Sequence, residues 1–344
     1  MIDKDFCMSS YLVFRYVIDD EYDFFESTKH QVYKLIPEND RILVYDENDV
    51  DSEIKKQISL LKNKKMGILL SGGMDSACLA SYIPGSDAYT FRFMEGEFQK
   101  EELKRAELFA EKNCLKLHYV DISWDTVKNN LEFLMKVKGA PVHSIEPQVY
   151  EAAKQAKNDG IDLMVIGDAA DYVFAGMDGL HAKDWEFDEF VERYTYLNPK
   201  EILLNPVDMN EAFEKYRVED KIDYIGLMHE YADIESYASY ANAFDAAKMN
   251  YIDPYEILKM GNPLDIYRIR NGESKYLIRS LFKLKYPDIP VPNKNPMPRP
   301  VDIYFENWEG PKRKEFRDDI NINKYTGNQK WQMYCLEKFL DMYE

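Results

Sequence analysis

Residues 71–76, of sequence Ser-Gly-Gly-Met-Asp-Ser, combine the residue types that a loop needs to hold a polyphosphate. Glycines allow a sharp turn and let phosphate oxygens approach main-chain N–H groups without an intervening Cβ atom. A helix that begins directly after the turn adds unpaired N–H donors and the positive end of its dipole. The segment lacks the Gly-Lys-Ser/Thr ending of the ordinary P-loop, so phosphate charge has to be neutralised by another group.

The carboxylate of Asp75 suggests Mg²⁺ as that group, because this ion bridges carboxylate and phosphate oxygens. Such a loop suits pyrophosphate as a leaving group, with attack at the α-phosphorus of ATP. We therefore predict ATP and Mg²⁺ as cofactors, and we expect the nucleotide to contact Leu70, Ser71, Gly72, Gly73, Asp75 and Ser76. The alternative is a tight strand-to-helix turn in which Asp75 only caps the helix.

A second acidic segment begins at Gly167 and places Asp168 and Asp171 after an apolar stretch at 163–166. In open α/β sheets the carboxyl ends of the strands share one edge, so this segment should lie beside residues 71–76. We predict Asp75 and Asp171 as Mg²⁺ ligands, Asp168 as the group that takes a proton from an attacking amine, and Gly167 as a nucleotide contact. The alternative is a helix cap with a first-turn acid.

The elements that position these residues follow from the hydrophobic pattern. Short apolar runs at 67–70, 88–93, 117–122 and 163–166 read as strands, and amphipathic stretches between them read as helices. This alternation predicts an α/β fold with an open parallel sheet flanked by helices. We expect an N-terminal helical segment (1–65), an ATP-binding α/β core (66–180) and a mainly helical C-terminal part that completes the domain (181–344).

Composition limits the partners. The formal charge is −18, from 62 acidic and 44 basic residues, which argues against a nucleic-acid partner. The four cysteines are scattered without a metal or redox motif, as is typical of a reducing compartment. The sequence shows neither a secretory leader nor an apolar run of about 18 residues, so we expect a soluble cytoplasmic protein without membrane contact.

The segment at 71–76 resembles the PP-loop of the N-type ATP pyrophosphatases, which include asparagine synthetase, GMP synthetase and argininosuccinate synthetase. Residues 167–176 resemble the Gly-Asp-Gly-Ala-Asp-Glu-Leu-Phe-Gly-Gly-Tyr motif of asparagine synthetase-like proteins. Together the two motifs make residues 7–308 similar to the synthetase domain of that family. The resemblance implies an AMP-forming ligase that adenylates a small carboxylate substrate and transfers the acyl group to ammonia or an amine.

The same resemblance implies roles for three further residues. Residues 90–93 match the strand whose backbone reads adenine in the family, which assigns Phe93 to the nucleotide. Lys275 begins a match to a Lys-Tyr-Leu-Leu-Arg helix and is also expected at the nucleotide. Lys294 matches the lysine of a Lys-x-Gly-Phe-x-x-Pro segment and would stabilise negative charge at the α-phosphate. Without the resemblance, Lys294 would be a surface lysine in a Pro-rich loop.

The chain also departs from the family pattern. The match begins near the start of the sequence, so we expect no glutaminase domain, with nitrogen arriving as ammonia, from a separate glutaminase subunit, or as an amine on the substrate. Tyr172 stands where the family has Glu, and Pro296-Met297 stand where it has Gly-Phe. Two alternatives remain open: a PP-loop sulfur transferase or nucleic-acid modifier, and a nucleotide-binding partner subunit without turnover.

Overall fold

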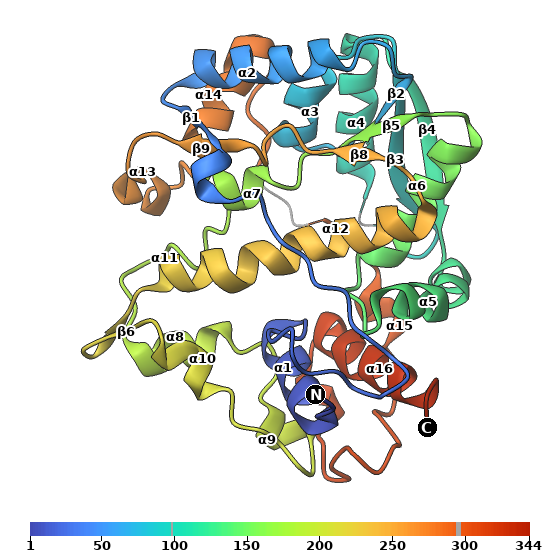
Figure 1. Ribbon diagram of the computed structural model, residues 1–344. Helices are drawn as coiled ribbons and strands as arrows, with labels where there is room; N and C mark the ends of the chain where they lie inside the picture. Colours follow the sequence, from blue (N-terminus) through green and yellow to red (C-terminus); the bar gives the residue numbers. More distant parts are fainter. Residues whose placement is uncertain (98, 294–296) are drawn as a thin grey trace.

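A computed structural model of the chain describes residues 1–97, 99–293 and 297–344 (Figure 1). Its main sheet has five parallel strands in the order β4-β3-β2-β5-β8. These strands are β2 (Met66–Leu69), β3 (Asp87–Phe93), β4 (Lys116–Ile122), β5 (Leu163–Val165) and β8 (Tyr251–Ile252). The expected α/β fold with an open parallel sheet is confirmed.

Helices cover both faces of this sheet, as the βαβ connections require. Alternate residues of one strand face opposite layers: Ala88 joins an apolar cluster with α3 (Met74–Ala80) and α4 (Lys100–Lys112), whereas Tyr89 joins one with α5 (Trp124–Lys138) and α6 (Glu146–Asn158). The α5 helix begins at a Ser123 capping box and ends at Gly139, whose φ of 68° suits glycine. The sheet therefore has an apolar core on each side.

The strand β8 was not expected from the sequence. It is two residues long, too short to carry a periodic pattern, and it pairs with β5 at the edge of the sheet. Two smaller pairings were also missed: β1 (Ile42–Val44) lies parallel to β9 (Leu258–Met260), and β6 (Arg217–Val218) forms a hairpin with β7 (Lys221–Ile222).

Segments from both ends of the chain complete the layers. The first helix, α1 (Lys4–Phe14), packs against α16 (Gly327–Asp341), and Lys4 Nζ lies 3.0 Å from a carboxylate oxygen of Glu344. The next helix, α2 (Glu47–Leu60), packs instead beside α14 (Tyr276–Lys285) above the sheet (Figure 1). Residues 1–65 thus contribute to two different layers of the molecule.

The C-terminal half is mainly helical. Its long helix α12 (Asp233–Ala247) packs on α6 and follows a π-helical turn, Met228–Ala232. The remaining helices are α7 (Ala170–Val173), α8 (Phe187–Tyr194), α9 (Pro199–Ile202), α10 (Asn210–Glu214), α11 (Tyr224–Leu227), α13 (Ile266–Arg270) and α15 (Val301–Tyr304), with 3₁₀ turns at Glu38–Asp40 and Ile322–Lys324. Across the described residues, none of the helices is long and apolar enough to cross a membrane.

Candidate active site

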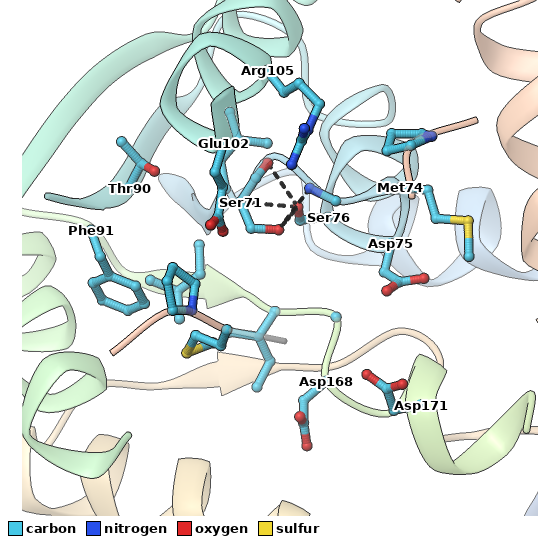
Figure 2. Close-up of a pocket in the computed structure, with 18 of the residues that line it drawn as sticks. Ser71, Met74, Asp75, Ser76, Thr90, Phe91, Glu102, Arg105, Asp168 and Asp171 are labelled. Carbon is cyan, nitrogen blue, oxygen red and sulfur yellow. Dashed lines mark hydrogen bonds between the residues drawn. The ribbon is translucent and has the colours of Figure 1, made fainter. Parts of the chain in front are cut away.

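The segment 71–76 connects the end of β2 to α3 and lines a cavity at the carboxyl edge of the sheet (Figure 2). Two other predicted segments line the same cavity: the end of β5 with Gly167 and the acidic residues after it, and the start of α14 with Lys275. Leu70, Ser71, Gly73, Asp75 and Ser76 all contribute to the lining. The structure therefore brings the two acidic segments together at one edge.

Hydrogen bonds between its two serines fix the shape of the loop. The Ser76 hydroxyl accepts from the Ser71 N–H (3.1 Å) and lies 3.0 Å from the Ser71 hydroxyl. The Ser71 hydroxyl in turn accepts from the Gly73 N–H at 3.1 Å. These bonds hold the strand-to-helix turn closed at its base, while both serines still face the cavity.

Gly72 does not line the cavity, and its packing explains its residue type. A Cβ atom at this position would lie 2.6 Å from the Glu102 carbonyl oxygen and 3.0 Å from Arg105 Cβ. Arg105 Nε also donates to the Gly72 carbonyl at 2.9 Å. The close approach of α4 thus requires glycine at position 72, and the expected contact of Gly72 with the nucleotide stays a prediction.

Asp75 and Asp171 meet at one cation, the ammonium group of Lys275. Its Nζ lies 2.7 Å from Asp75 Oδ2 and 3.0 Å from Asp171 Oδ1. Burial disfavours a charged Lys275, but the two carboxylates outweigh burial and raise its pKa. Lys275 is only 2% exposed. Its two ion pairs join the phosphate loop, the acidic segment and the start of α14, which are distant in the sequence.

Asp168 lies on the same side of the cavity as Asp75 and Asp171 (Figure 2). Burial, and then the negative charge of Asp171, raise the pKa of Asp168 to about 7. The Ser236 hydroxyl donates to Asp168 Oδ2 at 2.9 Å and opposes part of that shift. A carboxyl group with this pKa can accept or release a proton near neutral pH.

Asp253 and Tyr255, which were not among the predicted site residues, hold the acidic segment and the phosphate loop in place. Asp253, which follows β8, accepts hydrogen bonds from the N–H groups of Ala169 (2.7 Å) and Tyr255 (3.0 Å). The Tyr255 hydroxyl donates to the Asp75 carbonyl at 3.0 Å. Residues 253–255 therefore tie the acidic segment to the phosphate loop. An acid directly after an apolar dipeptide was the available signal, but a dipeptide is too short to show a strand pattern that would place it in the sheet.

The end of β3 lies beside the cavity, and the expected main-chain contact of Phe93 with the nucleotide stays a prediction. Phe93 does not line the cavity, whereas Thr90, Phe91 and Gln99 do. The Phe93 N–H donates to Gln99 Oε1 at 2.8 Å. The predicted catalytic residue Lys294 lies outside the described residues, although its neighbours Asn293, Met297 and Pro298 line the cavity.

The donor set at the acidic pair fits Mg²⁺. This ion is usually held by one or two carboxylates and completes its coordination with phosphate and water oxygens. Asp75 and Asp171 converge on one cationic group, as ligands of a shared ion would. No cluster of three or more His, Cys, Asp or Glu residues suited to a metal occurs within the described ranges, so phosphate would have to supply the remaining ligands.

A family comparison agrees with this geometry. The family described as asparagine synthase matches residues 51–255, which include the phosphate loop, the acidic segment and Asp253. The chain belongs to the asparagine synthase family. The matched part of this asparagine synthase family member spans the whole five-stranded sheet, from β2 to β8.

No curated protein matches this asparagine synthase family member. Two solved structures have low similarity to it. The U34-tRNA thiolase NcsA from Methanococcus maripaludis, with its 4Fe-4S cluster, is 15% identical, with a TM-score of 0.32, over 87% of this chain and 81% of that chain. The NMN synthetase from Francisella tularensis is 10% identical, with a TM-score of 0.29, over 74% of this chain and 100% of that chain. At these TM-scores the two likenesses carry no functional argument.

Proposed function

We propose that this protein is an ATP-dependent, AMP-forming ligase that adenylates a small carboxylate and transfers the acyl group to ammonia or an amine. The observation that carries the proposal is the meeting of residues 71–76, the Asp75–Lys275–Asp171 group and Asp168 at one edge of the sheet. Membership of the asparagine synthase family supports the same chemistry. Mg²⁺ bound with the phosphates would neutralise the charge of the leaving pyrophosphate.

The reaction divides into two displacements. A substrate carboxylate oxygen attacks the α-phosphorus of ATP, and the bond from that phosphorus to the bridging oxygen breaks, releasing pyrophosphate. The amine nitrogen then attacks the acyl carbon, and AMP leaves with the bonding electrons. Asp168 is the group on this chain suited to take the amine proton, because its pKa of about 7 lies near neutral pH.

An arginine, Arg299, follows the cavity-lining residues Met297 and Pro298 and is suited to a carboxylate substrate. Arg299 Nε is buried and has no hydrogen-bond partner among the described residues. The neighbouring carboxylate, Glu235, already pairs with Arg15 at 2.8 Å. Burial, together with the charge of Arg15, lowers the pKa of Arg299. A substrate carboxylate would supply the acceptor that Arg299 lacks, since an unsatisfied buried donor is costly.

The cysteines give no support to the sulfur-transfer alternative. Cys7, Cys78 and Cys335 are buried, and burial raises the pKa of each thiol, which disfavours the reactive thiolate. Cys114 is exposed and forms no disulfide with another cysteine in the described part of the chain.

The decisive experiment is a product assay with ATP, Mg²⁺ and ammonia against a panel of amino and hydroxy acids. We expect one acid to give AMP and pyrophosphate in equal amounts. The Asp171→Asn variant should lower that rate about 100-fold, because it removes one of the charges placed to hold the metal–pyrophosphate group. Asp178→Asn, at an exposed aspartate of the same loop region, is the matched control and should keep the wild-type rate. Formation of ADP and phosphate instead would contradict adenylation.

A further inference from the structure

One edge of β3 extends past the end of its neighbour β2. The last main-chain bond between the two strands runs from the Leu70 N–H to the Tyr89 carbonyl, at 2.9 Å. Beyond it β2 turns into the phosphate loop. Alternate residues of a strand direct their main-chain groups to the same edge, so Phe91 and Phe93 face the side that β2 has left. Their polar groups need a partner other than a strand.

Gln99 supplies that partner. Its Oε1 accepts from the Phe93 N–H at 2.8 Å, and its Nε2 donates to the Phe91 carbonyl at 3.2 Å. The side chain comes from the residue that precedes α4, is only 7% exposed and lines the cavity. A carboxamide thus occupies the position that a neighbouring strand or a ligand would otherwise take.

The pairing has a chemical counterpart in adenine. A carboxamide carries one acceptor and one pair of donor hydrogens on two atoms attached to the same carbon. Adenine presents the same order along one edge, because its ring N1 and its 6-amino group are attached to one carbon. The strand edge at Phe91 and Phe93 would therefore complement adenine in the way that it now complements Gln99.

The position of this edge suits a nucleotide. The cavity extends from Phe91 and Gln99 to Ser71 and Gly73, so one ligand could contact the strand edge with its base and the loop with its phosphates (Figure 2). Glu102 and Arg105 of α4 line the cavity between these two ends. Base and phosphate contacts would then be made in the same cavity, with Gln99 at the base end.

We propose, on the basis of the nucleotide-binding function argued above, that the Gln99 side chain is an internal competitor for the nucleobase. It fills the base position in this structure and leaves when adenine binds. A base enters only if it replaces both hydrogen bonds in the same order. Hypoxanthine presents an acceptor and a donor in the reverse order, so it cannot replace them. Gln99 thereby lowers the affinity for ATP, while the order of donor and acceptor on the strand edge selects adenine over other purines.

The consequence is measurable as a change in affinity. ATP has to break two hydrogen bonds of Gln99 to make two of its own, so removing the competitor should tighten ATP binding. We expect Gln99→Ala to lower the Kd of ATP about tenfold, as follows from the net strength of two such bonds. Inorganic tripolyphosphate has no base, so its Kd should stay within about twofold of the wild-type value.

The experiment is isothermal titration of the full chain, in Mg²⁺, with ATP, ITP and tripolyphosphate. The variants are Gln99→Ala and Gln99→Met, the second of which keeps the length of the side chain without either hydrogen bond. Both should tighten ATP binding while leaving tripolyphosphate unchanged, and ITP should gain less than ATP. Lys100→Ala, at the adjacent exposed residue, is the control and should change none of the three affinities. Circular dichroism would verify that each variant is folded.

The outcomes distinguish a failure of the proposed Gln99 role from a failure of the proposed nucleotide-binding function. If ATP and tripolyphosphate bind the wild-type protein but neither Gln99 variant tightens ATP binding, the role of Gln99 is wrong and the nucleotide site stands. Weaker ATP binding in both variants would likewise overturn it, because Gln99 would then assist the base. If no form of the chain binds ATP, the proposed function fails and the competitor role fails with it.

Discussion

Burial and the negative charge of nearby Asp171 raise the pKa of the Asp168 carboxyl group to about 7. As the base in the second displacement, Asp168 acts in its deprotonated form. We therefore expect the rate of amide formation to rise with pH through about 7 and to level off above it. Asp168→Asn should lower the rate at least about 100-fold and abolish this rise. A pH–rate profile of both proteins under saturating ATP measures the effect.

A stability measurement checks the same carboxyl group without a substrate. Its pKa is higher in the folded than in the unfolded chain, so its protonation stabilises the fold at low pH, and this contribution is lost as pH rises through about 7. The stability of Asp168→Asn, which stays neutral, should increase relative to wild type as pH rises to about 7 and should differ by a constant amount above that pH. A stability difference that does not change between pH 5 and 9 would contradict the raised pKa.

Individual residues were predictable to different degrees. Asp75, Asp168 and Asp171 could be placed together, because carboxyl ends of parallel strands share an edge. The ion pairs of Lys275 could not be predicted, because they depend on the left-handed backbone conformation of Lys275 (φ 52°) directly before α14. The contact of Gln99 with the end of β3 was also beyond the sequence, because nothing in its spacing marks a glutamine as a partner for a strand edge.

At the scale of elements, the edge strand β8 positions the acidic segment through Asp253. Asp253→Ala would leave the Ala169 N–H buried without its acceptor, at a cost of about 1–3 kcal/mol in the free energy of unfolding. The same change should weaken ATP binding, because Asp168 and Asp171 lie next to Ala169. Urea unfolding and ATP titration measure the two effects. The exposed Asp245→Ala, on α12, is the matched control and should cost less than about 0.5 kcal/mol.

The main elements were predictable where their patterns were long enough. The strand β3 and the helix α4 extend over 7 and 13 residues, and their periodicity identified both. In contrast, β8 has two residues and β1 has three, so their existence depends on pairing with strands that are distant in sequence. The short apolar run at 11–14 does not by itself distinguish a helix from a strand, and it forms the end of α1, followed by Arg15 in the left-handed conformation.

At the scale of the whole molecule, one buried ion pair lies where α5 and α6, which cover one face of the sheet, meet the long helix α12. Lys138 Nζ, at the end of α5, lies 2.6 Å from Glu146 Oε1 at the start of α6. The other oxygen of Glu146 accepts from Asn242 of α12 at 2.6 Å, and the His143 N–H donates to Oε1 at 2.7 Å. Both charged side chains are at most 4% exposed, so the network joins three helices without solvent.

Breaking that pair on one side should destabilise the whole domain, because the partner charge would stay buried. We expect Glu146→Leu to lower the free energy of unfolding by about 3–5 kcal/mol in urea titrations. Lys138→Met combined with Glu146→Leu should recover a large part of that loss, since no buried charge remains unpaired. The exposed pair of Lys128 and Asp125, 2.8 Å apart, provides the control: Asp125→Ala should cost at most about 1 kcal/mol. Equal losses for Glu146→Leu and Asp125→Ala would mean that the buried network does not hold the layers together.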